Sequence, residues 1–475
     1  MPPYVATALF VVFIAGLFWL DREKKPRISG WLWIPVIWFS LAASRSASQW
    51  LNLGAPIDAA DLLLEGNPVD RAVYTALLAC GLYVLGSRFK KLDRFLLANL
   101  PIVLFFSFCA VSLFWSDFPG VAFKRWLKAV GDFVMMLVVW TENDPQAGVR
   151  YLLKRAAFVL MPLSILLIKY YSSYGRTYGV FLGEVHYTGV STNKNTLGAI
   201  CMLFGLATMG QIFMLYRNRR LAGRKRKLVA NGIVLAIIVW LLMMASSMTS
   251  WSCLVMGSVL MLILHLRVIS ERPRIVHAVI LTMLVSSVGV VFLGVSPGTL
   301  SAMGRDPTLT TRTDMWPLLV RLCRNPLIGT GFGSFWLGKR IEEIWSIWKW
   351  KPNEAHNGYL EIYLNLGWTG VVLLAIVLVS GYRKAFMWYS REGTFGTLLL
   401  AYFVVGIAYN FTEAAFFQML HPVWLVLLLA MMGNAAWRRS KNVGTNAYVS
   451  TRQKSFKGNA EVTGLEESTA VGVQL

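Results

Sequence analysis

Long apolar stretches recur along the whole chain and are separated by short polar connections. Runs of roughly 16 to 23 apolar residues are about long enough to cross a hydrocarbon core of roughly 30 Å as an α-helix. The pattern therefore predicts an all-α polytopic membrane protein with about 12 to 13 transmembrane helices. The stretches fall near residues 4–20, 31–43, 72–86, 95–115, 126–140, 156–170, 196–215, 228–246, 251–266, 275–296, 358–380, 395–411 and 419–437.

The composition supports this membrane assignment. Of the 475 residues, 56% are hydrophobic and only 15% are charged, whereas soluble domains carry roughly 25% charged residues. A soluble globular protein is therefore excluded. The polar sequence at the C-terminal end predicts a disordered cytoplasmic tail over 441–475, after a polytopic domain over 1–440.

Lysine and arginine collect in every second connection, and the formal net charge is +22. The positive-inside rule places these basic connections in the cytoplasm. The RNRRLAGRKRK run at 217–227 is more typical of a loop that faces anionic lipid than of a nucleic-acid site, so no nucleic-acid partner is expected. By alternation, the connections 171–195 and 297–357 lie outside.

The longer outer connection, 297–357, is predicted to contain a short amphipathic helix. Thr313 is placed to cap this helix, and the proline and glycines of NPLIGTGFG, from Asn325 onward, end it. Its apolar face would rest on the helix bundle or the lipid boundary and leave the arginines facing water. We assign Trp316, Leu319, Val320 and Cys323 to that face.

The same connection carries arginines that could bind an anionic substrate. Guanidinium groups hold phosphate oxygens in a bidentate manner. The alternative interpretation is that these arginines bind lipid headgroups. The candidates are Arg305, Arg312, Arg321, Arg324 and Arg340.

His356 stands where the chain enters the next apolar helix. The positive end of a helix dipole disfavours an imidazolium there, so we expect a neutral imidazole that accepts a proton near pH 7. Asn357 is expected to cap this helix, and Glu361 is a possible orienting partner one turn further on. Glu413, just after a later span, is a second catalytic or structural carboxylate. The alternative for His356 is a simple helix cap.

The shorter outer connection, 171–195, also carries basic residues at a helix start. Its GVSTNKNTLGA sequence would present free backbone N–H groups to an anion, and Arg176, Lys194 and Asn195 could contact the same anion. The alternative is that Asn195 and Thr196 only cap the helix while Lys194 extends to the interface.

Several of these segments resemble a known family. The sequences R312-TDMW-P, N325-PLIGTGFGSF and H356-NGYLEIYLNLGWTG are similar to the signature of the O-antigen ligase and polymerase superfamily of bacterial envelope glycosyltransferases. GVSTNKNTLGA, WTENDP and YNFTEA are most similar to the exopolysaccharide polymerases of the rhizobial type. The resemblance implies a GT-C-like membrane enzyme with short amphipathic helices in its large periplasmic loop.

What the resemblance implies about activity is specific. It implies an inverting, metal-independent transferase without a cofactor, in the bacterial inner membrane, whose active site faces the periplasm. The donor would be an undecaprenyl-diphosphate-linked oligosaccharide and the acceptor a glycan. Arg176 and Arg312 would hold the diphosphate, and His356 would be the base or would position the acceptor hydroxyl. A flippase and a chain-length regulator would be partners in the bilayer.

Three functions compete at this stage. A polymerase of repeat units comes first, and a ligase that moves finished glycan to a lipid A core or another acceptor uses the same chemistry. A transporter of an anion or of a lipid-linked saccharide is the rival from another class. Transporters place charged residues near the bilayer midplane, often within internal repeats. Here the candidate charges lie in outer connections, which favours the transferases.

Overall fold

The computed structural model describes residues 1–22, 28–53, 66–179, 183–292 and 308–433. These residues belong to one compact unit, Met1–Gly433. The tail predicted over 441–475 and the candidate Arg305 lie outside the described residues.

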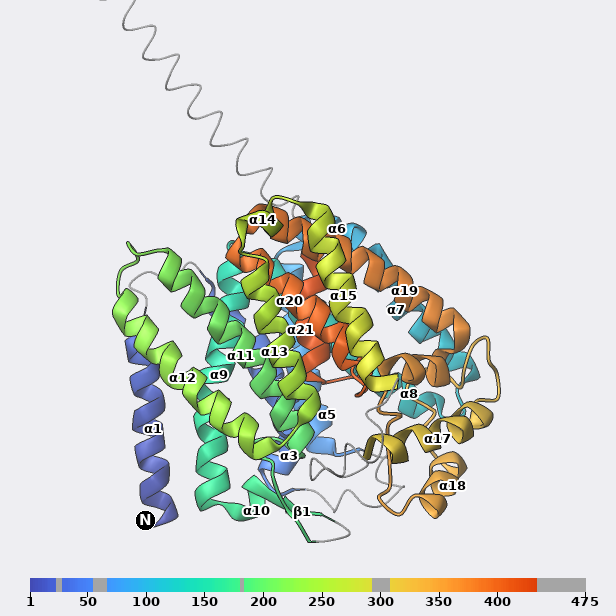
Figure 1. The fold of residues 1–475 in the computed structure, drawn as a ribbon. Coiled ribbons are helices and arrows are strands. Elements are labelled where there is room, and N and C mark those ends of the chain that lie inside the picture. The colour runs from blue at the N-terminus through green and yellow to red at the C-terminus, as the bar shows by residue number, and fades with distance from the viewer. Residues whose placement is uncertain (23–27, 54–65, 180–182, 293–307, 434–475) are drawn as a thin grey trace, which may run out of the picture. The chain divides into compact units, whose positions relative to one another are not determined.

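Helices make up nearly all of this unit (Figure 1). They are α1 (Pro3–Leu20), η1 (Gly30–Leu32), α2 (Trp33–Ala42), α3 (Ala47–Trp50), α5 (Pro68–Gly86), α6 (Phe89–Ala98), α7 (Leu100–Val111), η2 (Ser112–Trp115), α8 (Pro119–Trp140), α9 (Pro145–Tyr170), α10 (Ser172–Gly175), α11 (Lys194–Arg217), α12 (Arg224–Ala245), α13 (Met248–Ile263), α14 (Arg267–Ser270), α15 (Pro273–Phe292), α17 (Thr308–Leu322), α18 (Lys339–Ile347), α19 (Gly358–Glu392), α20 (Thr394–Tyr409) and α21 (Pro422–Met432). Strands β1 (Arg176–Tyr178) and β2 (Val185–Tyr187) form an antiparallel hairpin, with Arg176 opposite Tyr187.

The all-α polytopic prediction is confirmed, because each predicted apolar stretch is largely helical over its described residues. Six helices of the described chain are long and apolar enough to cross a membrane, and α6 with residues 100–115 forms a bent pair that can count as a seventh. Five further apolar helices are shorter, at 10–17 residues. Among the described residues, the number of helices of full spanning length is therefore lower than the 12 to 13 predicted, since several apolar stretches fold as short helices.

The two ends of the bundle carry different elements. Figure 1 shows α10, β1, α17 and α18 at one end and α6 and α14 at the other. The predicted outer connections lie at the first end, and predicted cytoplasmic connections lie at the second. Polar contacts also join connections of the second end, including an ion pair of 2.7 Å between Lys154 Nζ and Asp21 Oδ2. This arrangement is the one that alternating basic connections require.

Two apolar cores support the site end. The main core runs through the bundle, and every residue of α21 is buried in it. A second, smaller core lies beneath the long connection and joins α17 and α18 to the start of α19. Its buried members are Met315, Leu319, Cys323, Phe335, Trp336, Ile341, Ile344, Ala355 and Leu364.

The NPLIGTGFG segment packs against a break in α19. Gly367 has a φ of 62° and interrupts that helix, which leaves backbone groups without helical partners. The segment supplies them, because Trp368 N donates to Pro326 O at 2.8 Å and Gly331 N donates to Asn365 O at 2.8 Å. The sequence motif therefore fixes the long connection to the first turns of α19.

Replacing Gly329 by alanine should lower the unfolding temperature of the purified protein by several degrees. Gly329 has a φ of +67°, and a Cβ there would lie 2.4 Å from the carbonyl carbon of Asn365. Gly393→Ala is the matched control, since its φ is +50° but no atom lies within 4 Å of the added Cβ. Only backbone strain acts in the control, because its φ of 50° and ψ of −118° lie outside the regions that residues with a Cβ favour. Equal melting of the two variants would contradict the close packing.

Candidate active site

Helix α17 directs Arg312 into the bundle. Met315 and Leu319 form the buried face of this helix, with Cys323 just beyond its end, whereas Val320 is exposed. Arg312 precedes Met315 by three residues and so lies on the same, inward face. Two expectations were wrong: the helix begins at Thr308, not after a cap at Thr313, and Val320 is not part of the apolar face. Because the helix begins earlier than predicted, Arg312 lies within the helix and not before its first turn.

The guanidinium of Arg312 binds the turn that follows α20. Its Nη1 lies 3.2 Å from Oε1 of Glu413 and donates to the carbonyl oxygen of Thr412 at 3.0 Å. Asn195, in the first turn of α11, donates from Nδ2 to the same Oε1 at 3.2 Å. Glu413 is buried. One carboxylate thus joins the long connection, the shorter connection and the end of α20.

His356 completes this cluster from the other side of Glu413. Its Nδ1 lies 3.2 Å from Oε2 of Glu413 and 3.1 Å from Oε1 of Glu354. The backbone of His356 has a φ of 49°, in the left-handed region that few non-glycine residues adopt. Such strain is retained where the surrounding contacts hold it, and it turns the imidazole towards the two carboxylates.

The protonation state of His356 differs from the expectation. Burial by itself lowers the pKa of His356, but the carboxylates of Glu354 and Glu413 outweigh burial and raise that pKa to about 9. In turn, burial raises the pKa of Glu413, but His356 and Arg312 bring it below its usual value. The neutral imidazole predicted from the helix dipole is therefore wrong, since two carboxylates at hydrogen-bond distance dominate over the dipole. His356 is an imidazolium at neutral pH.

The stability of the protein should fall as the pH rises through about 9. The pKa of His356 is raised from its usual value of 6.5 to about 9 in the fold. Its ion pairs therefore contribute fully below pH 6.5 and are lost as His356 loses its proton near pH 9. Unfolding temperatures between pH 7 and 10 measure this loss. His356→Gln should show a smaller decline, and equal declines would contradict the raised pKa.

The residues next to His356 clamp it onto the turn that carries Glu413. Asn357 caps α19 as predicted, because its Oδ1 accepts from the backbone N–H groups of Tyr359 and Leu360 at 3.0 Å each. Its Nδ2 donates to Phe411 O at 3.2 Å. Gly358 N donates to Asn410 O at 2.8 Å. The start of α19 is thereby fixed to the YNFTEA turn.

The YNFTEA turn owes its shape to Asn410. The side-chain Oδ1 of Asn410 accepts from Ala415 N at 2.8 Å and Phe416 N at 2.9 Å. These bonds wrap residues 411–414 around the amide and direct the Glu413 carboxylate inward. The buried side chain of Asn410 thus holds the acid in place.

Glu361 has a different part from the one predicted. It makes no hydrogen bond to His356 in the described structure; instead its carboxylate accepts from Trp336 Nε1 at 2.8 Å and Ala355 N at 3.1 Å. The carbonyl oxygen of Ala355 accepts from Trp316 Nε1 of α17 at 3.0 Å. Ala355 immediately precedes His356, so Glu361 positions the histidine through the backbone.

The shorter connection reaches the cluster through Asn195. Arg176 does not join it: its Nε donates to Ile168 O at 3.0 Å, and its guanidinium lies over the Tyr187 ring. The opposite face of the hairpin carries His186, which lies 3.4 Å from Lys194 Nζ. The predicted cap was also misplaced, because Asn193, and not Asn195, accepts from Thr196 N at 2.8 Å. Asn195 is thereby left available for Glu413.

The other candidate arginines lie apart from this cluster. Arg340 is buried, donates to the carbonyl oxygens of Ser334 and Phe335, and pairs with Asp117 at 2.6 Å. Its polar groups are used by the protein itself. Arg321 and Arg324 are exposed on α17 and just beyond its end. As substrate ligands, all three remain predictions.

The donor set of Glu354, His356 and Glu413 also has the composition of a small metal site. Their ligand atoms lie within 4.8 Å of one another, and carboxylates with imidazole bind several divalent ions. The Arg312 guanidinium on Glu413 opposes a second cation at that carboxylate. A bifurcated hydrogen bond from His356 Nδ1–H to Glu354 and Glu413 accounts for the close approach of the three side chains. That the protein works without a metal remains a prediction.

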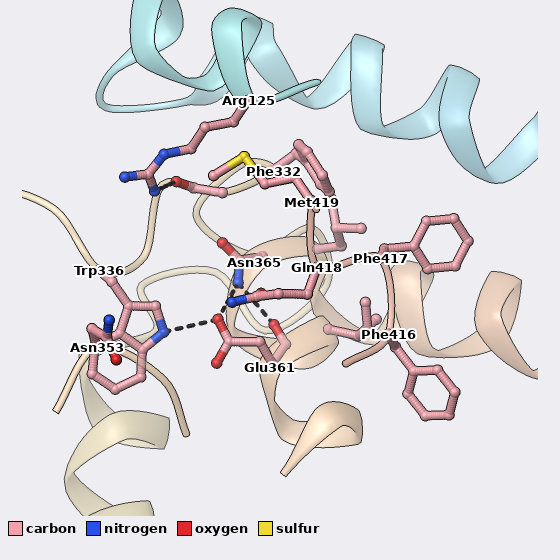
Figure 2. Close-up of a pocket in the computed structure, with 13 residues that line it drawn as sticks. Arg125, Phe332, Trp336, Asn353, Glu361, Asn365, Phe416, Phe417, Gln418 and Met419 are labelled. Atoms are coloured by element: carbon pink, nitrogen blue, oxygen red, sulfur yellow. Dashed lines mark hydrogen bonds between the residues drawn. The ribbon is translucent and has the colours of Figure 1, made fainter. Parts of the chain in front are cut away.

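A cavity of about 190 Å³ lies next to the cluster (Figure 2). Trp336, Asn353, Glu361 and Gln418 line it, and Arg125 of α8 reaches it from above in the view. Sequence reasoning missed Arg125, Asn353 and the cluster member Glu354. Arg125 lies in α8, far along the chain from the long connection, and no sequence pattern relates the two, although its Nη1 donates to Gly333 O of that connection. Glu354 stands in the EAHN segment, two residues before the histidine, so the sequence alone could have identified it.

Fold and cluster together define a multi-pass membrane protein with two cations and two carboxylates gathered at one end of its helix bundle. Residues 233–375, which include Arg312, Glu354 and His356, match the family model described as O-Antigen ligase. The chain is also 26% identical over 294 residues to the exopolysaccharide production protein ExoQ of Rhizobium meliloti (strain 1021). That alignment covers 60% of this chain and 64% of the relative. The resemblance to the O-antigen ligase and polymerase family, with an ExoQ-like character, is confirmed.

Proposed function

We propose that the protein is a glycosyltransferase that polymerises oligosaccharide repeat units carried on undecaprenyl diphosphate, for an exopolysaccharide. The observation that carries this proposal is the cluster in which Glu413 holds Arg312 and His356 at the ends of α17, α19 and α20. Two cations aimed at one place fit a diphosphate leaving group. The similarity to a protein of exopolysaccharide production supports the product class.

The reaction would be a single displacement with inversion. A hydroxyl oxygen of the acceptor sugar attacks the anomeric carbon of the donor, the glycosidic bond forms, and the bond to the diphosphate oxygen breaks. Arg312 and the His356 imidazolium neutralise the charge that develops on the departing diphosphate. Energy comes from the glycosyl-diphosphate bond, so the proposal needs no cofactor and no metal.

The raised pKa of His356 decides where the hydroxyl proton goes. An imidazolium cannot accept it, so His356 serves to position the acceptor and the diphosphate. Glu354 lies beside it, and its side chain is 23% exposed against 7% for Glu413. We assign the proton to the Glu354 carboxylate, which reaches the acceptor more easily than the buried Glu413.

Purified protein in liposomes, supplied with lipid-linked repeat unit alone, tests the proposal. A ladder of products that differ by one repeat unit is the expected result. Product that forms only after a different acceptor is added would identify a ligase. A ligase is the second candidate because the matching family model is described as O-Antigen ligase. Movement of saccharide across the bilayer without covalent change would identify a transporter and overturn the proposal.

The cluster is proposed to face the periplasm, and single cysteines can test this. Arg324 is exposed just beyond the end of α17, and Arg220 is exposed in the basic connection at the other end. Arg324→Cys should react with a membrane-impermeant maleimide in intact spheroplasts, whereas Arg220→Cys should react only after the membrane is permeabilised. The reverse pattern would place the site in the cytoplasm. The native cysteines are first replaced by serine in both variants.

A further inference from the structure

The cavity beside the cluster is lined by side chains suited to an uncharged polar ligand. Its volume is about 190 Å³, and its walls come from α8, the start of α19 and the segments around Phe332, Asn353 and Gln418. Figure 2 shows Arg125, Trp336, Glu361 and Gln418 around one space. Arg125 and the Glu361 carboxyl group both line the cavity, so a ligand there meets a hydrogen-bond donor as well as an acceptor.

Two amide groups of this cavity have unused hydrogen-bonding capacity. The side chains of Asn353 and Gln418 make no hydrogen bond to other described residues of the chain. Each amide offers two donor hydrogens and an acceptor oxygen, which match sugar hydroxyl groups. Trp336 and Phe416 add aromatic surface. Mostly apolar walls with a few convergent polar groups are typical of small-molecule sites.

The position of the cavity relates it to the reaction. Asn353 immediately precedes Glu354, and Phe416 follows Glu413 by three residues. The two segments that carry the carboxylates of the cluster therefore also form walls of the cavity. Glu361 connects the cavity to the cluster, because its carboxyl group lines the cavity and accepts a hydrogen bond from Ala355 N, next to His356.

We propose that this cavity is a subsite for one neutral pyranose ring of the glycan, held by the amides of Asn353 and Gln418. The inference rests on the proposed function, since it assigns a sugar of that substrate to a place. It predicts that the subsite governs the affinity for glycan and leaves the displacement step unchanged.

The test uses purified full-length protein and the oligosaccharide released by mild hydrolysis of the host's own exopolysaccharide. Binding is followed by calorimetry for the wild type, Asn353→Ala, Gln418→Ala and the double variant. We expect the double variant to bind at least about tenfold more weakly, as the loss of two modest hydrogen bonds implies. Asn218→Ala, an exposed amide in the basic connection, is the control and should bind as the wild type does.

Kinetics separate this inference from the proposed function. In the liposome assay the double variant should show a raised KM for glycan with kcat within about twofold of the wild type. Ladder formation with an unchanged KM and unchanged binding would overturn the subsite and leave the function standing. If the wild type makes no ladder but binds the oligosaccharide more tightly than the double variant does, the subsite is supported and the polymerase proposal is overturned.

Discussion

Arg312→Ala is expected to slow glycan transfer by roughly 10² to 10³ fold, the usual cost of removing one preorganised donor to a developing charge. The guanidinium of Arg312 is held by Glu413 Oε1 at 3.2 Å and by Thr412 O at 3.0 Å, so it is oriented before substrate arrives. Initial rates of ladder formation in proteoliposomes give the effect. Diphosphate binding and charge neutralisation are both lost in this variant.

Two further variants make the Arg312 result specific. Arg312→Lys keeps the charge but cannot form the two-pronged contact, so it should also be impaired. Lys339→Ala removes an exposed cation from α18 in the same long connection, and its rate should stay close to that of the wild type. If Lys339→Ala is as slow as Arg312→Ala, the basic residues act as a general basic surface and the assignment of Arg312 fails.

Glu413→Gln is expected to reduce transfer by at least roughly 10² fold and to destabilise the protein. The change leaves Arg312 and His356 beside an uncharged amide. Breaking a buried charge pair on one side costs roughly 3–5 kcal/mol, because the remaining charge stays buried. The pKa of His356 should fall, since one of the two carboxylates that raise it is gone.

The pH dependence of transfer distinguishes this effect from simple unfolding. In Glu413→Gln the alkaline loss of activity should shift to lower pH than in the wild type. Glu343→Gln, an exposed glutamate of α18, is the control and should change neither rate nor pH profile. A Glu413→Gln variant with the activity and the alkaline limit of the wild type would remove Glu413 from the account.

The helices were predictable from the sequence because apolar stretches of helical length leave few alternatives in a membrane. The end of α17 was also predictable, since Pro326 and the glycines after it cannot continue a helix. The start of α17 was not, because Thr313 has the chemistry of a cap and nothing local shows that the helix already began at Thr308. Tertiary packing also decides which face of α17 points inward, and Val320 is not on that face.

The site was predictable only in part. Arg312, His356 and Glu413 were each singled out, but their meeting at one carboxylate depends on segments about 100 and 57 residues apart. The charge of His356 was predicted wrongly for the same reason: a local dipole is visible in sequence, whereas Glu413 approaches from a distant turn. The two segments WTENDP and YNFTEA, which both resemble the family, have different places in the structure. Glu142 of WTENDP binds Ser29 and Arg88, away from the cluster. The YNFTEA turn carries Glu413, which belongs to the cluster.

The central claim is that Arg312 and His356 act together on one departing diphosphate. Initial rates of ladder formation from lipid-linked repeat unit, measured for Arg312→Ala, His356→Ala and the double variant in liposomes, test this claim most directly. We predict severe loss in each single variant and a double variant little slower than the worse single, as for residues that act as a unit. Wild-type rates in either single variant would contradict it.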